Sequence, residues 1–135
     1  MAKLTEAQAE VVKGSRSFAS LATLRKDGSP HITPIWVDYD GENVVINTAQ
    51  GRAKTSHIRR DPRVSISIYD QDNPYRYVEV SGTAEIADEG DEAWEHIDKM
   101  HRKYHGSGEY PRGGPQRVLV RIHPEKVSTM GFEDE

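Results

Sequence analysis

The sequence predicts a mainly β protein in which antiparallel strands close into a barrel with a few helices at its corners. The first observation is a succession of strand-like segments separated by turn signals, KDGSP at residues 26–30 and DG at residues 40–41. The second is the lack of helical crossovers between most of these segments, which a doubly wound parallel sheet would need. The third is the length of 135 residues, which suits one domain with a core and is short for two. We therefore expect a single domain over residues 1–135.

The first half of the chain predicts a helix, three consecutive strands and a second helix. Thr5 and Gln8 form a capping box at the start of a short polar helix within residues 1–14, and Gly14 ends it. The segments SFASLATLR, HITPIWVDY and ENVVINTA predict strands that pair antiparallel in sequence order. RAKTSHIRR predicts one or two helical turns that end before Pro62, because the residue preceding a proline avoids helical angles.

The second half predicts two more strands, a long helix and a strand-like end. VSISIY alternates apolar and polar residues, and YRYVEVSGTAEI is a long strand with a bulge or bend at Gly82. Residues 91–104 place Ile97 and Tyr104 on one face of an amphipathic helix. HGSGEYPRGGPQ predicts a flexible loop able to cover a pocket, and RVLVRIHP and KVSTMG predict two short strands broken at Pro124.

Composition indicates a cytoplasmic protein without a membrane segment. There is no cysteine, which excludes disulfides, thiolate metal sites and thiol nucleophiles and fits a reducing compartment. No apolar stretch is long enough to span a bilayer, so we expect no membrane partner. A hydrophobic share of 35% and a mean hydropathy of -0.77 are low for a monomer with a generous core. We therefore expect a second subunit to bury part of the surface.

A basic segment interrupts a chain whose formal net charge is -4. Asn47 and Thr48 end a strand, Gly51 allows a tight turn, and Arg52 and Lys54 lie where a helix begins. Backbone amides at a helix start, a hydroxyl and two cations form a receptor suited to a phosphate group. The alternative is that these cations are solvated on a short surface helix, which is the interpretation we apply to the following RRDPR.

A second candidate feature is the proline inside the segment PHITPIWV. Because a proline cannot donate to a sheet ladder, Pro34 marks an edge or a break in the sheet. A planar heterocycle could bind the main-chain groups of Thr33, Ile35 and Trp36, with the indole ring of Trp36 as a wall. Alternatively, Pro34 guards an edge strand, and Trp36 belongs to the core or to a dimer interface.

Neither a metal site nor a nucleic-acid site is supported by the sequence. His96 and His101 are five residues apart and do not share a helix face, so we interpret both as surface or interface residues. His101 and His105 have the proper spacing, but the second falls at a helix end beside a Gly-rich loop. The acidic balance and the absence of a basic stripe interleaved with aromatic residues argue against nucleic acid as a partner.

Three segments, DGSPHITPIWVDYDGENVVINTAQGRAK, RRDPRVSISI and YVEVSGTAEI, resemble the flavin-binding split β-barrel family related to pyridoxamine phosphate oxidase. Within that family the chain is most similar to the actinobacterial branch of deazaflavin-dependent (coenzyme F-420-dependent) oxidoreductases, over residues 18–130. The resemblance implies a six-stranded antiparallel split β-barrel with Greek-key connections, of the FMN-binding type. It also implies a homodimer with two equivalent cofactor sites at the subunit interface.

The resemblance assigns residues to that cofactor site. Thr48, Arg52 and Lys54 match residues that grip the phosphate of a flavin-like cofactor, whose tricyclic ring lies against the HITPIW strand. Where the pyridoxamine-phosphate branch has a glutamine that reaches the cofactor, this chain has Tyr77, and its Arg-Lys pair is separated by Ala53. These departures argue against a pyridoxamine substrate and favour the deazaflavin over FMN. The implied cofactor-binding residues are Thr33, Pro34, Ile35, Trp36, Asn47, Thr48, Gly51, Arg52, Lys54 and Tyr77.

The implied function is an oxidoreductase that uses reduced F-420 to transfer a hydride to an electron-poor small-molecule acceptor. No catalytic side chain is required, because the cofactor supplies the hydride, and a product proton could come from solvent, Tyr77 or His31. The acidic tail of the cofactor could pair with Arg59, Arg60 or Arg112. The alternatives are an FMN-dependent oxidoreductase of the same fold and a non-catalytic flavin- or haem-binding protein.

Overall fold

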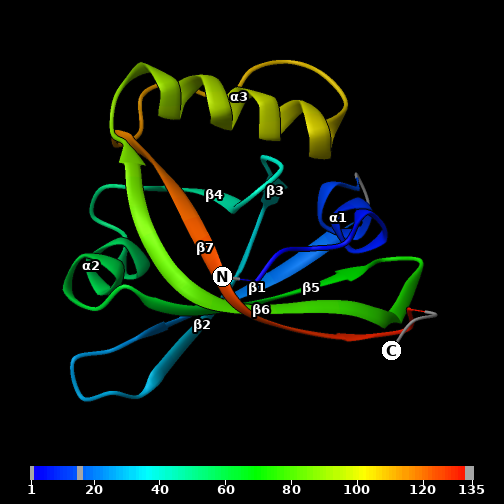
Figure 1. The fold of residues 1–135 in the computed structure, drawn as a ribbon. Helices are drawn as coiled ribbons and strands as arrows, with labels where there is room; N and C mark the ends of the chain where they lie inside the picture. The colour runs from blue at the N-terminus through cyan, green and yellow to red at the C-terminus, as the bar shows by residue number, and fades with distance from the viewer. Residues whose placement is uncertain (1, 15–16, 133–135) are drawn as a thin grey trace.

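A curled antiparallel sheet with three helices on its surface forms the computed structural model, which describes residues 2–14 and 17–132 (Figure 1). The helices are α1 (Glu6–Lys13), α2 (Ala53–Arg60) and α3 (Asp91–His105). The strands are β1 (Ser17–Leu24), β2 (Pro30–Ile35), β3 (Val37–Tyr39), β4 (Val44–Ala49), β5 (Arg63–Asp70), β6 (Asn73–Asp88) and β7 (Arg117–Met130). The three predicted helices are confirmed, and so is the capping box between Thr5 and Gln8.

The strands pair in the order β2-β1-β5-β6-β7-β4-β3. β2 and β3 are therefore the two edges of the sheet, yet Trp36 alone separates them along the chain. The Cα atoms of Ile35 and Val37 can be at most about 7 Å apart, so the sheet must curl until its edges approach each other. We call this junction, residues 35–37, the seam. Pro34 is tolerated next to it because β2 is an edge strand.

The prediction of six strands in a closed barrel is wrong in two respects. Residues 31–39 form two strands rather than one, because the chain passes from one sheet edge to the other at Trp36, and the sheet has seven strands. The sheet also keeps its edges open, since no pairing joins β2 to β3 in the part of the chain that the structure describes. The mainly β, antiparallel character is confirmed, in the form of a curled half-barrel.

β6 and β7 form a long bent arm of the sheet (Figure 1). Their register shifts between Ser81 and Gly82, where Pro124 lies opposite Gly82. A Cβ atom on Gly82 would lie 2.0 Å from the carbonyl oxygen of His123, so only glycine allows the strands to approach this closely. The irregularity predicted at Gly82 is confirmed. The predicted break at Pro124 is wrong, because β7 continues through it to Met130.

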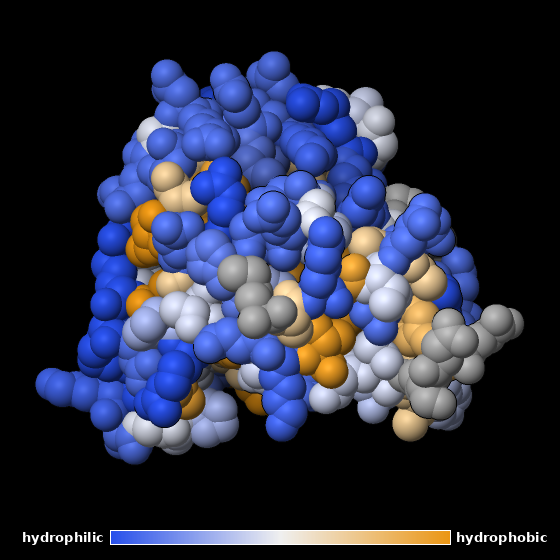
Figure 2. All heavy atoms as spheres, in the orientation of Figure 1, coloured by the Kyte–Doolittle hydropathy of each residue, from blue (hydrophilic) through white to orange (hydrophobic). Residues whose placement is uncertain are grey.

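The main hydrophobic core is built from alternate residues of the strands and is covered by α1. Ile66 of β5, Val80 of β6 and Val120 of β7 are fully buried in it, and Val12 of α1 packs against the same cluster. Figure 2 shows that hydrophilic side chains dominate the part of the surface where α3 lies, while apolar side chains gather in patches below it. None of the helices within the described ranges is long and apolar enough to cross a membrane.

Candidate functional site

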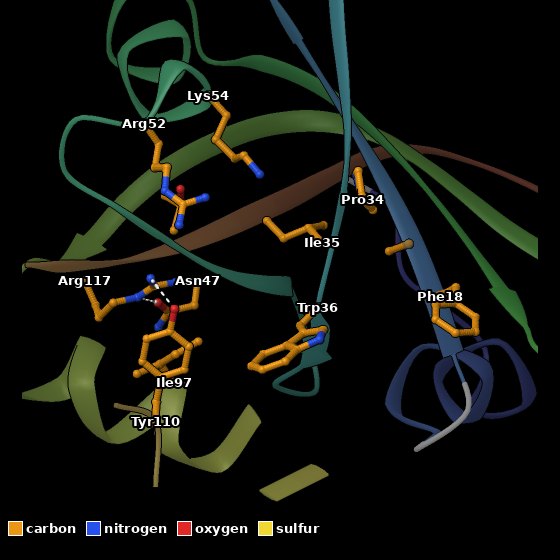
Figure 3. A pocket seen from close by; sticks show the side chains of 12 residues that line it. Phe18, Pro34, Ile35, Trp36, Asn47, Arg52, Lys54, Ile97, Tyr110 and Arg117 are labelled. Carbon is orange, nitrogen blue, oxygen red and sulfur yellow. Dashed lines mark hydrogen bonds between the residues drawn. The ribbon is translucent and has the colours of Figure 1, made fainter. Parts of the chain in front are cut away.

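A cavity of about 390 Å³ opens between the seam, the start of α2 and the loop after α3. Figure 3 shows Arg52, Lys54 and Arg117 on one side of it and Ile35, Trp36 and Phe18 on the other. One wall is therefore cationic and the opposite wall apolar. The lining residues are Phe18, Ala19, Pro34, Ile35, Trp36, Asn47, Thr48, Arg52, Lys54, Ile97, Tyr110 and Arg117.

Most of the residues predicted to bind a cofactor come together at this cavity. Those that line it are Pro34, Ile35, Trp36, Asn47, Thr48, Arg52 and Lys54. Gly51 does not line it, but its φ of 85° turns the chain from β4 into α2, a conformation that glycine adopts without strain. Thr33 and Tyr77 do not line it either.

The start of α2 supplies two of the cations. Arg52 is the N-cap residue, and Lys54 lies in the first turn. The hydroxyl of Thr55 donates to the carbonyl oxygen of Ala49 at 2.7 Å, which fixes this helix start on the end of β4. Burial, followed by the charges of Arg52 and Arg117, lowers the pKa of Lys54. No acidic side chain among the described residues pairs with Arg52 or Lys54.

An arginine that the sequence did not single out completes the cationic wall. Arg117, at the start of β7, is only 7% exposed. Its Nε donates to Asn47 Oδ1 at 2.9 Å, and its Nη1 donates to the hydroxyl of Tyr110 at 3.4 Å. Burial lowers the pKa of its guanidinium, and no carboxylate in the described part of the chain pairs with it. A buried cation without a counter-charge is costly, so this wall is suited to an anionic ligand.

The sequence contains only a weak signal for Arg117. An arginine directly before the buried run VLV is equally typical of a strand end that points into solvent. What places Arg117 beside the turn into α2 is its pairing with Ala49 across β4 and β7. A pairing between segments so far apart in sequence cannot be deduced from one chain.

The loop after α3 is held in place by Asp98. Oδ1 of Asp98 accepts from the backbone amide of Tyr110 at 2.9 Å and from Arg112 Nη1 at 2.8 Å, while Oδ2 accepts from Arg112 Nη2 at 2.9 Å. The hydrogen bonds from Arg112 are the main cause that lowers the pKa of Asp98 to about 2. Tyr110 is thereby held at the cavity, with its ring centroid 4.8 Å from the guanidinium of Arg117.

The indole of Trp36 forms the wall at the seam. It stacks on the ring of Tyr104, and the ring of Tyr110 lies nearly perpendicular to it, with 6.4 Å between ring centroids. The hydroxyl of Tyr104 also accepts a hydrogen bond from the backbone amide of Val37 at 3.2 Å. Helix α3 therefore holds two consecutive residues of the seam. A flat ligand entering the cavity meets an aromatic face on this side and cations on the other.

The two predicted residues outside the cavity have different surroundings. Thr33 precedes Pro34 on β2, and its buried Oγ1 has no hydrogen-bond partner in the described chain. Tyr77 lies opposite Tyr69 of β5 and Met130 of β7, away from the cavity. Their assignment to a cofactor stays a prediction.

The other charged residues considered in the sequence are engaged elsewhere. Arg59 pairs with Glu89, and Arg63 pairs with Asp61 at 2.7 Å, as the surface interpretation predicts. His96, interpreted as a surface or interface residue, has a side chain that is only 10% exposed and lies beside Asp38. Within residues 2–14 and 17–132, no group of three His, Asp or Glu side chains is placed to hold a metal ion.

Comparison with known families identifies the family of this chain. Residues 4–131 match the family model described as Pyridoxamine 5'-phosphate oxidase. The chain belongs to this family. The matched region contains every residue that lines the cavity. The family resemblance inferred from the segments that contain GRAK, RRDPRV and VSGTAEI is therefore confirmed.

Similar proteins support the F-420-dependent branch. The F-420H(2)-dependent biliverdin reductase of Mycobacterium tuberculosis (strain CDC 1551 / Oshkosh) is 23% identical over 112 residues, covering 83% of this chain and 78% of that protein. A solved structure named F-420 Reductase matches with a TM-score of 0.79 at 31% identity, covering 93% of this chain and 98% of that one. The structure of a conserved hypothetical protein from Mycobacterium tuberculosis matches with a TM-score of 0.74 at 32% identity, covering 94% and 84%.

Proposed function

We propose that this protein is an oxidoreductase that uses reduced coenzyme F-420 to transfer a hydride to an electron-poor small-molecule acceptor. The observation that carries the proposal is the convergence of Arg52, Lys54 and Arg117 on one wall of the cavity, without a carboxylate partner among the described residues. Uncompensated cations favour a phosphate-bearing ligand, and the apolar wall opposite favours a planar ring. The relatives named as an F-420-dependent biliverdin reductase and an F-420 reductase support this choice of cofactor.

The residues that line the cavity fit both the phosphate end and the ring end of such a ligand. Arg52, Lys54 and Arg117 would hold the phosphate together with the backbone amides at the start of α2. Trp36 and Ile35 would hold the ring against the edge of β2. When bound, reduced F-420 supplies a hydride from its C5. The chain binds and orients the reactants and keeps water away from the apolar wall.

We further propose that a second copy of the chain completes the site as a homodimer. Strand register places Phe18, Tyr69, Tyr77 and Met130 in one row across β1, β5, β6 and β7. Phe18 is 46% exposed and Met130 48% exposed, so this row is an apolar surface available to a partner. Because Phe18 also lines the cavity, a copy seated on the row would close the cavity from outside. Tyr77, which does not line the cavity of its own subunit, would then lie at the interface.

Sedimentation velocity tests the homodimer. We expect Tyr69→Glu to shift the protein towards monomer and to weaken F-420 binding, although Tyr69 does not line the cavity. Ser107→Glu, in the exposed loop after α3, is the matched control and should leave both properties unchanged. An unaltered sedimentation coefficient for Tyr69→Glu would argue against this surface as the interface.

The cofactor is tested by equilibrium titration with F-420 and with FMN, followed by fluorescence quenching. Tighter binding of F-420 supports the proposal, and tighter binding of FMN supports an FMN-dependent oxidoreductase of the same fold. Turnover is tested by incubating the protein with reduced F-420 and a panel of quinones, enones and tetrapyrroles. Tight binding without oxidation above background would mean storage or delivery of the cofactor rather than catalysis.

A further inference from the structure

A continuous chain of hydrogen bonds leads from the cationic wall of the cavity to a buried carboxylate on β3. Arg117 Nε donates to Asn47 Oδ1 at 2.9 Å. Asn47 Nδ2 lies 2.9 Å from the carbonyl oxygen of Ala93 and 3.1 Å from His96 Nδ1. His96 Nε2 lies 3.3 Å from Asp38 Oδ2. β7, β4, α3 and β3 are therefore connected through their side chains.

The two ends of the Asn47 side chain determine the direction of these bonds. The backbone carbonyl of Ala93 can only accept, and the guanidinium of Arg117 can only donate. The amide nitrogen of Asn47 must therefore face Ala93, and its oxygen must face Arg117. The same nitrogen donates to His96 Nδ1, which must be unprotonated. The ring proton of His96 consequently lies on Nε2 and is donated to Asp38.

Asp38 is a fixed acceptor at the far end of the chain. Burial raises the pKa of Asp38, but the hydrogen bonds from His96 and from Lys99, whose Nζ lies 3.0 Å from Asp38 Oδ2, outweigh it and hold the pKa well below its ordinary value. The carboxylate therefore stays charged. Arg117 and Asp38 are opposite charges at the two ends of a chain of aligned dipoles, which polarise one another.

We propose that His96 is a positioning residue for the ligand's anionic group, acting in its neutral, Nε2-protonated form through Asn47 on Arg117. Because Nε of Arg117 is committed to Asn47, the guanidinium has one orientation and its Nη atoms remain for the anion, apart from the long contact of Nη1 to Tyr110. The inference rests on the proposed function for the identity of the ligand. The hydrogen-bond chain itself is present without the ligand.

A proton on His96 Nδ1 would undo this arrangement. Nδ1–H and Asn47 Nδ2–H would then be two donors facing each other. If the amide of Asn47 turned over to relieve this, its nitrogen would face the Arg117 donor and its oxygen would face the carbonyl oxygen of Ala93. Either result releases the guanidinium from its fixed orientation. The affinity for an anion at the cavity should therefore depend on the protonation of His96.

Charged groups from several elements lie around His96. These charged groups line a groove that also contains His96. The residues that β4 places next to His96, Val45 and Asn47, are uncharged. The charged residues are Asp38 on β3, Asp40 after it, Glu92, Glu95 and Lys99 on α3, and Arg121 on β7.

The first arm of the test needs no ligand. Nitrogen NMR of the His96 ring and hydrogen exchange of the Arg117 Nε–H are measured in the parent, His96→Ala and His123→Ala. His123 is the matched control, because it forms an exposed pair with Glu85 at 3.1 Å on the same strand as Arg117. We expect an Nε2–H tautomer in the parent and an Nε–H exchange about tenfold faster in His96→Ala alone. The opposite tautomer, or unchanged exchange, would overturn the proposal.

The second arm measures F-420 affinity between about pH 8 and about pH 5. Glutamine at position 96 can accept from Asn47 and donate to Asp38 but cannot take up a proton, so we expect His96→Gln to retain the affinity of the parent at about pH 8. In acid, the parent should lose about tenfold more affinity than His96→Gln. Parallel pH profiles would overturn the proposal, and this comparison stands even if His96→Ala fails to fold. If the parent binds neither F-420 nor FMN, the proposed function fails, while the NMR arm still decides the role of His96.

Discussion

Trp36 and Tyr104 stack with their ring centroids 5.3 Å apart and their planes 8° apart. Trp36 is the one residue between the two edge strands, so this stack fastens the seam of the curled sheet to α3. The adjacent hydrogen bond from Val37 to the hydroxyl of Tyr104 fastens the next residue. The shape of the cavity therefore depends on one helix face holding one junction of the sheet.

The first prediction concerns this junction. Tyr104→Phe keeps the ring stack but leaves the backbone amide of Val37 without its acceptor, so we expect the free energy of unfolding to fall by about 1–3 kcal/mol. Urea denaturation measures it. Tyr75→Phe, which alters a tyrosine exposed to solvent, should change the free energy by less than about 0.5 kcal/mol. Equal stabilities of the two variants would contradict the role assigned to Tyr104.

The second prediction concerns the cations at the start of α2. Arg52→Ala combined with Lys54→Ala should weaken F-420 binding by much more than tenfold, because each charge-assisted contact contributes about 1.5–3 kcal/mol. Fluorescence titration measures it. Lys3→Ala combined with Lys13→Ala removes the same charge from exposed positions outside the cavity and should have little effect. If both double variants lost affinity equally, overall charge rather than a site would be responsible.

The third prediction separates binding from stability at Arg117. Arg117→Met removes a buried cation that has no carboxylate partner, which offsets the hydrogen bond lost at Asn47. We therefore expect F-420 affinity to fall more than about tenfold while the free energy of unfolding changes by less than about 1 kcal/mol. Lys126→Met, at an exposed position further along β7, is the control and should leave affinity unchanged. A variant that lost stability but kept affinity would place Arg117 in the scaffold alone.

The fourth prediction concerns pH and the loop after α3. The folded protein holds the pKa of Asp98 at about 2, below its ordinary value of 3.8, so its contribution to stability is complete above about pH 4 and is lost as the pH falls towards about 2. Thermal unfolding of the parent and of Asp98→Asn should differ most near neutral pH and converge near pH 2. Asp98→Asn should also weaken F-420 binding by releasing Tyr110. Glu10→Gln, exposed on α1, should show neither effect.

Local signals account for the parts of the fold that were predicted correctly. The Thr5 and Gln8 capping box, the stop before Pro62 and the irregularity at Gly82 each depend on a few neighbouring residues, and each is present. The errors occurred where the local structure depends on pairing between strands that are distant in the sequence. The split of residues 31–39 at Trp36 and the continuity of β7 through Pro124 are consequences of which strands pair.

The sequence by itself determined the family, the order of helices and strands, and the half of the cationic wall that Arg52 and Lys54 form, because these depend on residues close together in the chain. Only the tertiary structure decided that Arg117 and Tyr110 line the cavity and that a chain of hydrogen bonds leads from Asn47 there to Asp38. The physical reason is that a strand's register and a helix's docking are set by burial summed over the whole sheet. The identity of a single arginine or histidine does not indicate which distant strand will lie beside it.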